Sequence, residues 1–279
     1  MKNRLSVSIV IPVYNEERHI KACLDATMAQ SVQPLEIIIV DNNCTDRTIE
    51  LALQYPRVKI VKEPMQGRGA ARTAGFNAAR GDIIGRIDAD SILTAGWIER
   101  VTQDFGDASV MGLTGLGKTN LFPRPRNLFI AFWARVYFWV THAYFDSITM
   151  WGANMAVRRS MWLKVNQQVT LDDKLVHEDQ DLSLVILGVG GKIIQDNKLL
   201  VITKGLSYFY WPKFWEYFIR SIKTKQYHER KHTVPRDSHL RIGLWRALPG
   251  AIIGWFFGVI FIIGSVVAWP VNFLLLKRN

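Results

Sequence analysis

The stretch Gly85-Arg86-Ile87-Asp88-Ala89-Asp90-Ser91 ends an apolar run with two carboxylates that are spaced two residues apart. Successive side chains of a strand point to opposite faces, so Asp88 and Asp90 can project to the same side of a strand end. Carboxylate oxygens suit a hard cation such as Mg²⁺ or Mn²⁺, which commonly takes diphosphate oxygens as further ligands. An isolated Asp-x-Asp pair is also typical of a polar turn, so the rest of the chain has to decide between the two interpretations.

Strands and helices are predicted to alternate upstream of this stretch. Apolar, β-branched runs cover residues 7–13, 36–40, 58–61 and 82–87, and segments with helical periodicity follow the first three of them. Asn15 is predicted to cap the first helix. Strands that are apolar on both faces and alternate with helices indicate a mostly parallel sheet that is flanked by helices, which is an α/β fold.

Polar clusters follow three of these predicted strands, at Tyr14-Asn15-Glu16, Asp41-Asn42 and Asp88-Ala89-Asp90. In parallel sheets, ligands bind outside the carboxyl ends of the strands. The sequence therefore predicts a nucleotide-binding crevice at this edge. A Rossmann dinucleotide fold is disfavoured, because Pro12-Val13-Tyr14-Asn15 follows the first strand in place of a Gly-x-Gly-x-x-Gly turn.

The composition of the 279-residue chain is that of a globular protein, with 49% hydrophobic and 21% charged residues. Cys23 and Cys44 are its two cysteines, and neither has neighbours at metal-ligand spacing. We expect two unpaired thiols and no structural zinc site.

A C-terminal membrane helix is predicted from residue 251 to residue 269, where no residue is charged. A helix of this length spans ~28 Å, close to the thickness of the hydrocarbon core. A buried core helix and a re-entrant segment that turns at Pro270 are the alternatives. Gly250, Gly254 and Gly258 lie on one face of this helix, so a homo-oligomer that packs through this face is a hypothesis.

Between Lys204 and Arg246, ten Lys or Arg residues and three acidic residues give a net charge of +7, and aromatic residues alternate with them. An anionic membrane surface fits this pattern better than nucleic acid does. The N-terminus has no signal-peptide pattern, and the basic flank predicts a cytoplasmic catalytic domain at the cell membrane. The expected organisation is a catalytic domain (1–205), a basic and aromatic interfacial segment (206–246), and a transmembrane segment with its tail (247–279).

Six short motifs of the first two hundred residues, taken in order, closely resemble those of the inverting GT-A glycosyltransferases of family 2. They are Ser8-Ile9-Val10-Ile11-Pro12-Val13-Tyr14-Asn15-Glu16-Glu17, Ile39-Val40-Asp41-Asn42-Asn43-Cys44-Thr45-Asp46, Ala71-Arg72-Thr73-Ala74-Gly75-Phe76, Asp88-Ala89-Asp90, Gly152-Ala153-Asn154 and His177-Glu178-Asp179-Gln180-Asp181-Leu182. The resemblance implies a GT-A nucleotide-sugar-binding fold and a hexosyltransferase activity.

The resemblance also implies the donor site. The nucleotide-sugar-binding residues would be Pro12, Tyr14, Glu16, Asp41, Asn42, Arg72, Asp88 and Asp90. Among them, Arg72 is expected near the diphosphate. The nucleoside base, uridine or guanosine, stays open, because Asn42 replaces a carboxylate that is frequent in the family and Cys44 replaces its usual Ser.

The implied cofactor is a divalent cation, Mn²⁺ or Mg²⁺. Asp90 would be its direct ligand, and Asp88 would lie toward the ribose or a metal-bound water. The cation would neutralise the departing nucleoside diphosphate, so no leaving-group acid is needed.

The acidic motif 178–182 resembles the part of the family that supplies the catalytic base, and Asp179 is the predicted base. Glu178, Trp151, Gly152 and Asn154 are expected around the donor sugar and the acceptor. Without the resemblance, the same acidic residues would be typical of a helix start, where negative charge is favourable.

The predicted function is the transfer of a single sugar from a UDP- or GDP-sugar to a lipid or lipid-linked acceptor. A Gln-x-x-Arg-Trp segment, which processive synthases carry, is missing from the sequence. The alternatives are a polyprenyl-phosphate sugar synthase and a non-catalytic, membrane-bound scaffold that binds nucleotide sugars.

Overall fold

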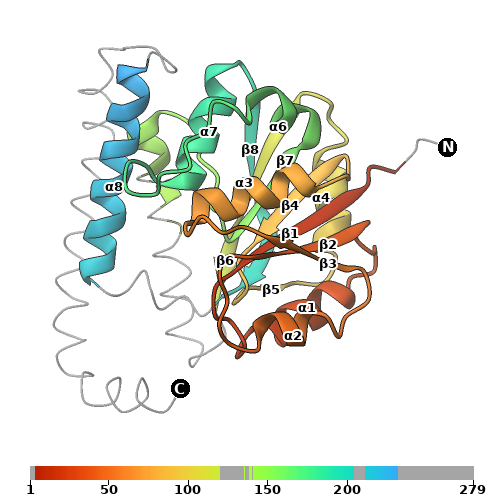
Figure 1. The fold of residues 1–279 in the computed structure, drawn as a ribbon. Coiled ribbons are helices and arrows are strands. Elements are labelled where there is room, and N and C mark those ends of the chain that lie inside the picture. Colours follow the sequence, from red (N-terminus) through yellow and green to blue (C-terminus); the bar gives the residue numbers. More distant parts are fainter. Residues whose placement is uncertain (1–3, 120–134, 136–137, 140, 204–210, 232–279) are drawn as a thin grey trace, which may run out of the picture. The chain divides into compact units, whose positions relative to one another are not determined.

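The computed structural model describes residues 4–119, 135, 138–139, 141–203 and 211–231. Its strands form one mixed sheet in the order β3-β2-β1-β4-β7-β6-β8-β5 (Figure 1). The strands are β1 (Val7–Val13), β2 (Glu36–Asp41), β3 (Val58–Lys62), β4 (Ile83–Ile87), β5 (Ile92–Leu93), β6 (Val110–Lys118), β7 (Asn154–Arg158) and β8 (Lys192–Ile202).

The first four strands are the predicted ones, and they pair in parallel, with β1 between β2 and β4 and β2 next to β3. The predicted α/β class is therefore confirmed. The second half of the sheet is mixed: β7 is antiparallel to β4 and β6, β6 and β8 are parallel, and β5 is antiparallel to β8.

Helices cover both faces of the sheet (Figure 1). They are α1 (Ile20–Met28), α2 (Thr48–Ala52), α3 (Arg68–Ala78), α4 (Trp97–Asp104), α6 (Arg159–Val165), α7 (Glu178–Gly188) and α8 (Trp211–Arg230). In β1, Ile9 and Ile11 join a core with α1 and α4, whereas Val10 joins a second core with α3, α6 and α7. This split follows from the two-residue periodicity of a strand and explains why the strands are apolar throughout.

The prediction that Asn15 caps the first helix is wrong. Helix α1 begins at Ile20, and Asn15 has a left-handed backbone with φ 56°. Its side-chain oxygen instead accepts a hydrogen bond from the backbone N–H of Thr45, at 2.8 Å. Asn tolerates this conformation better than most residues do, and here it ties the loop after β1 to the loop after β2.

Helix α8 lies within the predicted interfacial segment 206–246 and packs on α7. Contacts divide the chain into a large unit, residues 1–134 with 148–236, and a small unit, residues 135–147 with 237–279. In the small unit, the rings of Tyr144 and Phe145 meet edge to face at 5.2 Å. The predicted domain boundaries stay predictions.

The predicted membrane helix 251–269 lies outside the described residues. None of the helices in the described ranges is both long and apolar enough to cross a bilayer.

Gly75 of α3 allows the close packing of this helix on the parallel strands. A Cβ atom at this position would lie 2.4 Å from Val10 Cγ1 and 2.7 Å from Val40 Cγ2. We therefore expect Gly75→Ala to lower the free energy of unfolding by about 1–3 kcal/mol, the usual cost of overpacking a core. Chemical denaturation measures the change, and the cost should shrink in a Val10→Ala background. An equal cost in both backgrounds would contradict this explanation.

Candidate active site

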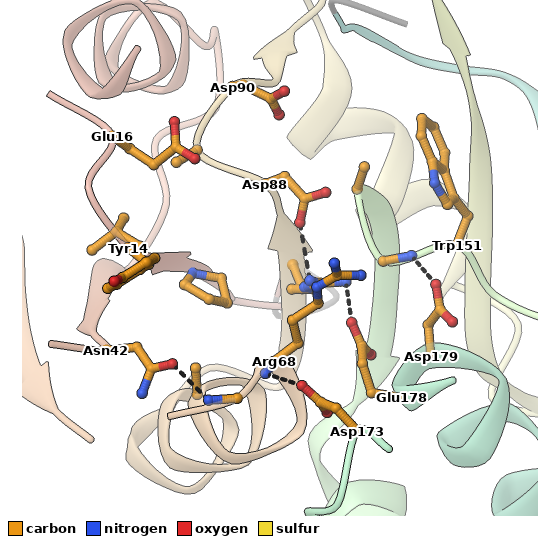
Figure 2. Close-up of a pocket in the computed structure, with 18 of the residues that line it drawn as sticks. Tyr14, Glu16, Asn42, Arg68, Asp88, Asp90, Trp151, Asp173, Glu178 and Asp179 are labelled. Atoms are coloured by element: carbon orange, nitrogen blue, oxygen red, sulfur yellow. Dashed lines mark hydrogen bonds and ion pairs between the residues drawn. The ribbon is translucent and has the colours of Figure 1, made fainter. Parts of the chain in front are cut away.

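A cavity of about 630 Å³ opens at the carboxyl ends of β1, β2 and β4 (Figure 2). Most of the predicted site residues line it, namely Pro12, Tyr14, Glu16, Asn42, Asp88, Asp90, Trp151, Gly152, Glu178 and Asp179. The cavity thus brings together residues from the strand ends, from the loop after β2 and from the start of α7. Its position agrees with the expectation that ligands bind at the carboxyl ends of parallel strands.

Three predicted site residues do not line the cavity. Asp41 accepts a hydrogen bond from the backbone N–H of Cys44 and so shapes the loop after β2. Arg72 is fully buried, and its Nη1 contacts the backbone oxygen of Glu178. Asn154 is also fully buried: its amide accepts from Trp97 Nε1 and donates to the carbonyls of Leu116 and Leu199. The expected place of Asn154 near the sugars is therefore corrected to a bracing role inside the sheet.

Carboxylates gather at one end of the cavity, where Figure 2 shows Glu16, Asp88 and Asp90 around a common space. Burial, together with the charges of Asp88 and Glu16, raises the pKa of Asp90 to about 6. A bound cation would relieve this repulsion, and oxygen ligands of this kind fit Mn²⁺ or Mg²⁺. Among the described residues, no three His, Cys, Asp or Glu side chains lie close enough together to hold a metal ion by themselves. Such a cation would therefore need further oxygen ligands from the donor.

Arg86 connects the Asp88 end of the cavity to the acidic motif. Its Nη2 lies 2.9 Å from Asp88 Oδ1, and its Nη1 lies 3.2 Å from Glu178 Oε1. The two carboxylates raise the pKa of the guanidinium, although burial opposes them. A Cβ atom at residue 152 would lie 1.4 Å from Arg86 Nη1, so only glycine fits there. The close approach that Gly152 permits is thus that of Arg86.

Tyr14 and Asn42, two of the residues predicted to bind the nucleoside, differ in whether their side chains are free to contact a ligand. Tyr14 is 54% exposed, and its ring borders the cavity. The Asn42 side chain is buried: its oxygen accepts from the backbone N–H of Gly67, and its nitrogen donates to the carbonyls of Glu63 and Met65. Its hydrogen-bonding groups therefore hold the loop after β3 in place and are not free to bind a base.

The acidic motif begins helix α7. The backbone N–H of Gly152 donates to Asp179 Oδ2 at 2.9 Å, and His177 Nδ1 lies 2.5 Å from Asp179 Oδ1. Burial alone would raise the pKa of Asp179, but His177, the Gly152 N–H and Arg86 together lower it below its ordinary range. Asp179 is therefore held as a carboxylate on the wall of the cavity.

The cavity lining also includes Arg68, Asp173 and Tyr217, which the sequence did not single out, and Arg86 and His177, which lie in quoted motifs but were not predicted as site residues. Arg86 and Arg68 were detectable: Arg86 lies near the end of β4, two residues before Asp88, and Arg68 follows the carboxyl end of β3. Asp173 binds the backbone N–H groups of Arg68 and Gly69, more than a hundred residues away. No local signal marks Asp173 or Tyr217, because only tertiary packing brings them here.

Residues 8–163 match the family model described as Glycosyl transferase family 2. The chain belongs to this family. The resemblance to glycosyltransferase family 2 that the six motifs show is thus confirmed. The matched region contains the strand ends and the Asp88–Asp90 pair, and helix α7 follows it.

Curated relatives match about two fifths of the chain or less. The "Uncharacterized glycosyltransferase EpsJ" of Bacillus subtilis (strain 168) is 32% identical over 115 residues, which are 40% of this chain and 33% of that protein. A chondroitin synthase of Pasteurella multocida (strain Pm70) is 35% identical over 103 residues, which are 36% of this chain and 11% of that protein. The matches span about a third or less of the length of these relatives.

Solved structures share the fold. A mannosyltransferase from Pyrobaculum calidifontis, PcManGT in complex with GDP-Man and Mn²⁺, has a TM-score of 0.62 at 18% identity, over 96% of this chain and 81% of that chain. S. aureus TarS 1-349 in complex with UDP-GlcNAc has a TM-score of 0.55 at 16% identity, over 71% of this chain and 58% of that chain.

The raised pKa of Asp90 predicts a stability that depends on pH. Its folded pKa of about 6 exceeds the unfolded value, so ionisation of Asp90 destabilises the fold as the pH rises from about 4 to about 6. Without metal, Asp90→Asn should therefore increase the free energy of unfolding by about 2 kcal/mol at pH 7.5 and by little at pH 4.

Urea denaturation at the two pH values measures this effect. Asp88→Asn is the matched control: it should destabilise the fold, because it removes a partner of the buried Arg86. Equal stability of Asp90→Asn and the unchanged protein at pH 7.5 would contradict the prediction.

Proposed function

We propose that this protein is an inverting glycosyltransferase that moves a single sugar from a UDP- or GDP-sugar to a lipid or lipid-linked acceptor at the cytoplasmic face of the cell membrane. The observation that carries the proposal is one cavity with two separate carboxylate sites. Asp88 and Asp90 lie at one site and Asp179 lies at the other, with Arg86 between them.

The donor would lie along the strand ends. The exposed ring of Tyr14 offers a stacking surface for the base. Asp88 and Asp90 would hold a Mn²⁺ or Mg²⁺ ion, which when bound neutralises the charge on the departing nucleoside diphosphate. Arg68 and Arg86, both in the cavity lining, are placed to pair with diphosphate oxygens. They take the role that the sequence predicted for Arg72.

Asp179 would act as the base. An inverting transfer needs one carboxylate on the face of the sugar opposite the leaving group, to accept the proton of the acceptor hydroxyl as its oxygen attacks the anomeric carbon. Asp179 is ionised, lines the cavity, and keeps its place through the Gly152 N–H. Glu178 is paired with Arg86 and its pKa is raised by burial, whereas Asp179 is held as a carboxylate, so Asp179 is the one of the two that is ready to accept a proton.

Features of the sequence support a lipid acceptor and a location at the membrane. The net charge of +7 between Lys204 and Arg246 and the uncharged segment 251–269 both suit a protein at an anionic bilayer. Transfer to a polyprenyl phosphate is the alternative within this class, since a phosphate acceptor needs little deprotonation. Identification of the radiolabelled lipid product would distinguish the two acceptors.

The experiment is the release of nucleoside diphosphate by the full chain in membranes, with UDP- and GDP-sugars, native lipid extract, and either Mn²⁺ or a chelator. Metal-dependent release that lipid stimulates, from one donor, would support the proposal. Donor binding without release across the whole panel would favour a non-catalytic scaffold.

Asp179→Asn should lower the rate of transfer by about 10²–10⁴-fold, the usual contribution of a general base, and should leave donor binding unchanged. Asp90→Ala should weaken donor binding as well, because the donor and the metal bind together. Full turnover in Asp179→Asn with a hydroxyl acceptor would contradict the assignment of the base.

A further inference from the structure

His177 is the ionisable side chain in contact with Asp179. Its Nδ1 lies 2.5 Å from Asp179 Oδ1, and its ring packs at 5.5 Å against the ring of Tyr217 on α8. The His177 side chain is only 13% exposed, and the part that remains accessible belongs to the cavity lining. A histidine in this place can fix the direction of the carboxylate and balance its charge.

Helix α8 holds the backbone of His177 in place. The backbone N–H of His177 donates to Thr224 Oγ1 at 2.7 Å, and Thr224 is fully buried. Two further bonds join α8 to the acidic motif: Gln180 Nε2 donates to Ser221 Oγ at 2.9 Å, and His228 Nε2 lies 2.9 Å from Asp181 Oδ1.

Ser221, Thr224 and His228 have the three- and four-residue spacing of one helix face. These three side chains are buried, and each makes a polar contact with α7 or the residue before it, so hydrogen-bond direction as well as apolar area fixes the position of α8. A change in α8 would thus be felt at the residues next to the base.

We propose that α8 is a positioning helix for the catalytic base: it fixes His177 through Thr224, and His177 in turn aims the Asp179 carboxylate. This inference rests on the proposed function, because it takes Asp179 as the base. His177 is a positioning residue in this account, since the acceptor proton goes to Asp179.

The charges around the pair support this role. Asp179 and Glu178 raise the pKa of His177, whereas burial and Arg68 of α3 lower it. Asp179 itself faces His177, the Gly152 N–H and Arg86 of β4. The negative charge of Asp179 raises the pKa of His177. The pKa of His177 should therefore fall when Asp179 is replaced by a neutral residue.

The first test is an NMR titration of the His177 imidazole in the full chain, assigned by its loss in His177→Asn. Asp179→Asn should lower the His177 pKa, because burial then acts with less opposition. Other histidine signals should keep their pKa. An unchanged His177 titration would overturn the proposal, whether or not the protein turns over a donor.

The second test is steady-state transfer at saturating donor and metal. His177→Phe keeps a ring against Tyr217 but removes the contact to Asp179, and it should lower kcat by about tenfold or more with an unchanged donor KM. His177→Asn, which keeps an N–H donor, should restore part of the rate. Thr224→Val should also lower kcat. Gln226→Ala, an exposed change on α8, is the matched control and should behave like the unchanged protein.

The outcomes distinguish the positioning role of α8 from the proposed function. Wild-type kcat in His177→Phe would overturn the positioning role, and so would a loss in Thr224→Val that Gln226→Ala shares. If His177→Phe does not fold, His177→Asn and Thr224→Val decide. Absence of transfer by the unchanged protein would count against the proposed function. The titration of His177 would still show whether His177 and Asp179 interact as proposed.

Discussion

The buried positive charge of Arg86 is the interaction on which the rest of the site depends. Moving a guanidinium out of water costs several kcal/mol unless carboxylates compensate it, and Arg86 is only 4% exposed. Asp88 from the end of β4 and Glu178 from the start of α7 provide that compensation. The ion pairs therefore fix the distance between the two ends of the cavity, and Gly152 supplies the space for the guanidinium.

This arrangement explains why neighbouring carboxylates differ in their ionisation. Glu178 and Asp179 are consecutive and both buried, yet the pKa of Asp179 is lowered and that of Glu178 is raised. The difference comes from the partners: Asp179 has the Gly152 N–H and His177, whereas burial prevails for Glu178 despite Arg86 and Arg72. Burial and the charges of Asp88 and Glu16 leave Asp90 with a raised pKa, and a bound cation would offset this repulsion.

Helix α8 extends the site beyond the sheet. Its partners on α7 and the preceding loop are a side-chain amide, a backbone N–H and a buried carboxylate, so the helix is held by directional bonds. The carboxylate of Asp181 also accepts the backbone N–H of Thr170, which ties the loop before α7 into the same set of contacts. The acidic motif is thus supported from two sides by segments that the family match, which ends at residue 163, does not include.

The sequence by itself determined the α/β class, the first four strands and the edge at which the site lies, because burial on both faces leaves a pattern in each strand and polar residues follow the strand ends. It also determined the family, through six motifs in order. Only the tertiary structure decided the roles of Arg72 and Asn154, which are buried braces, and brought in Arg68, Asp173 and Tyr217. Side chains that meet across a hundred residues or more leave no local periodicity, so their contacts follow from how α3, α7 and α8 pack and from which partner compensates each buried charge.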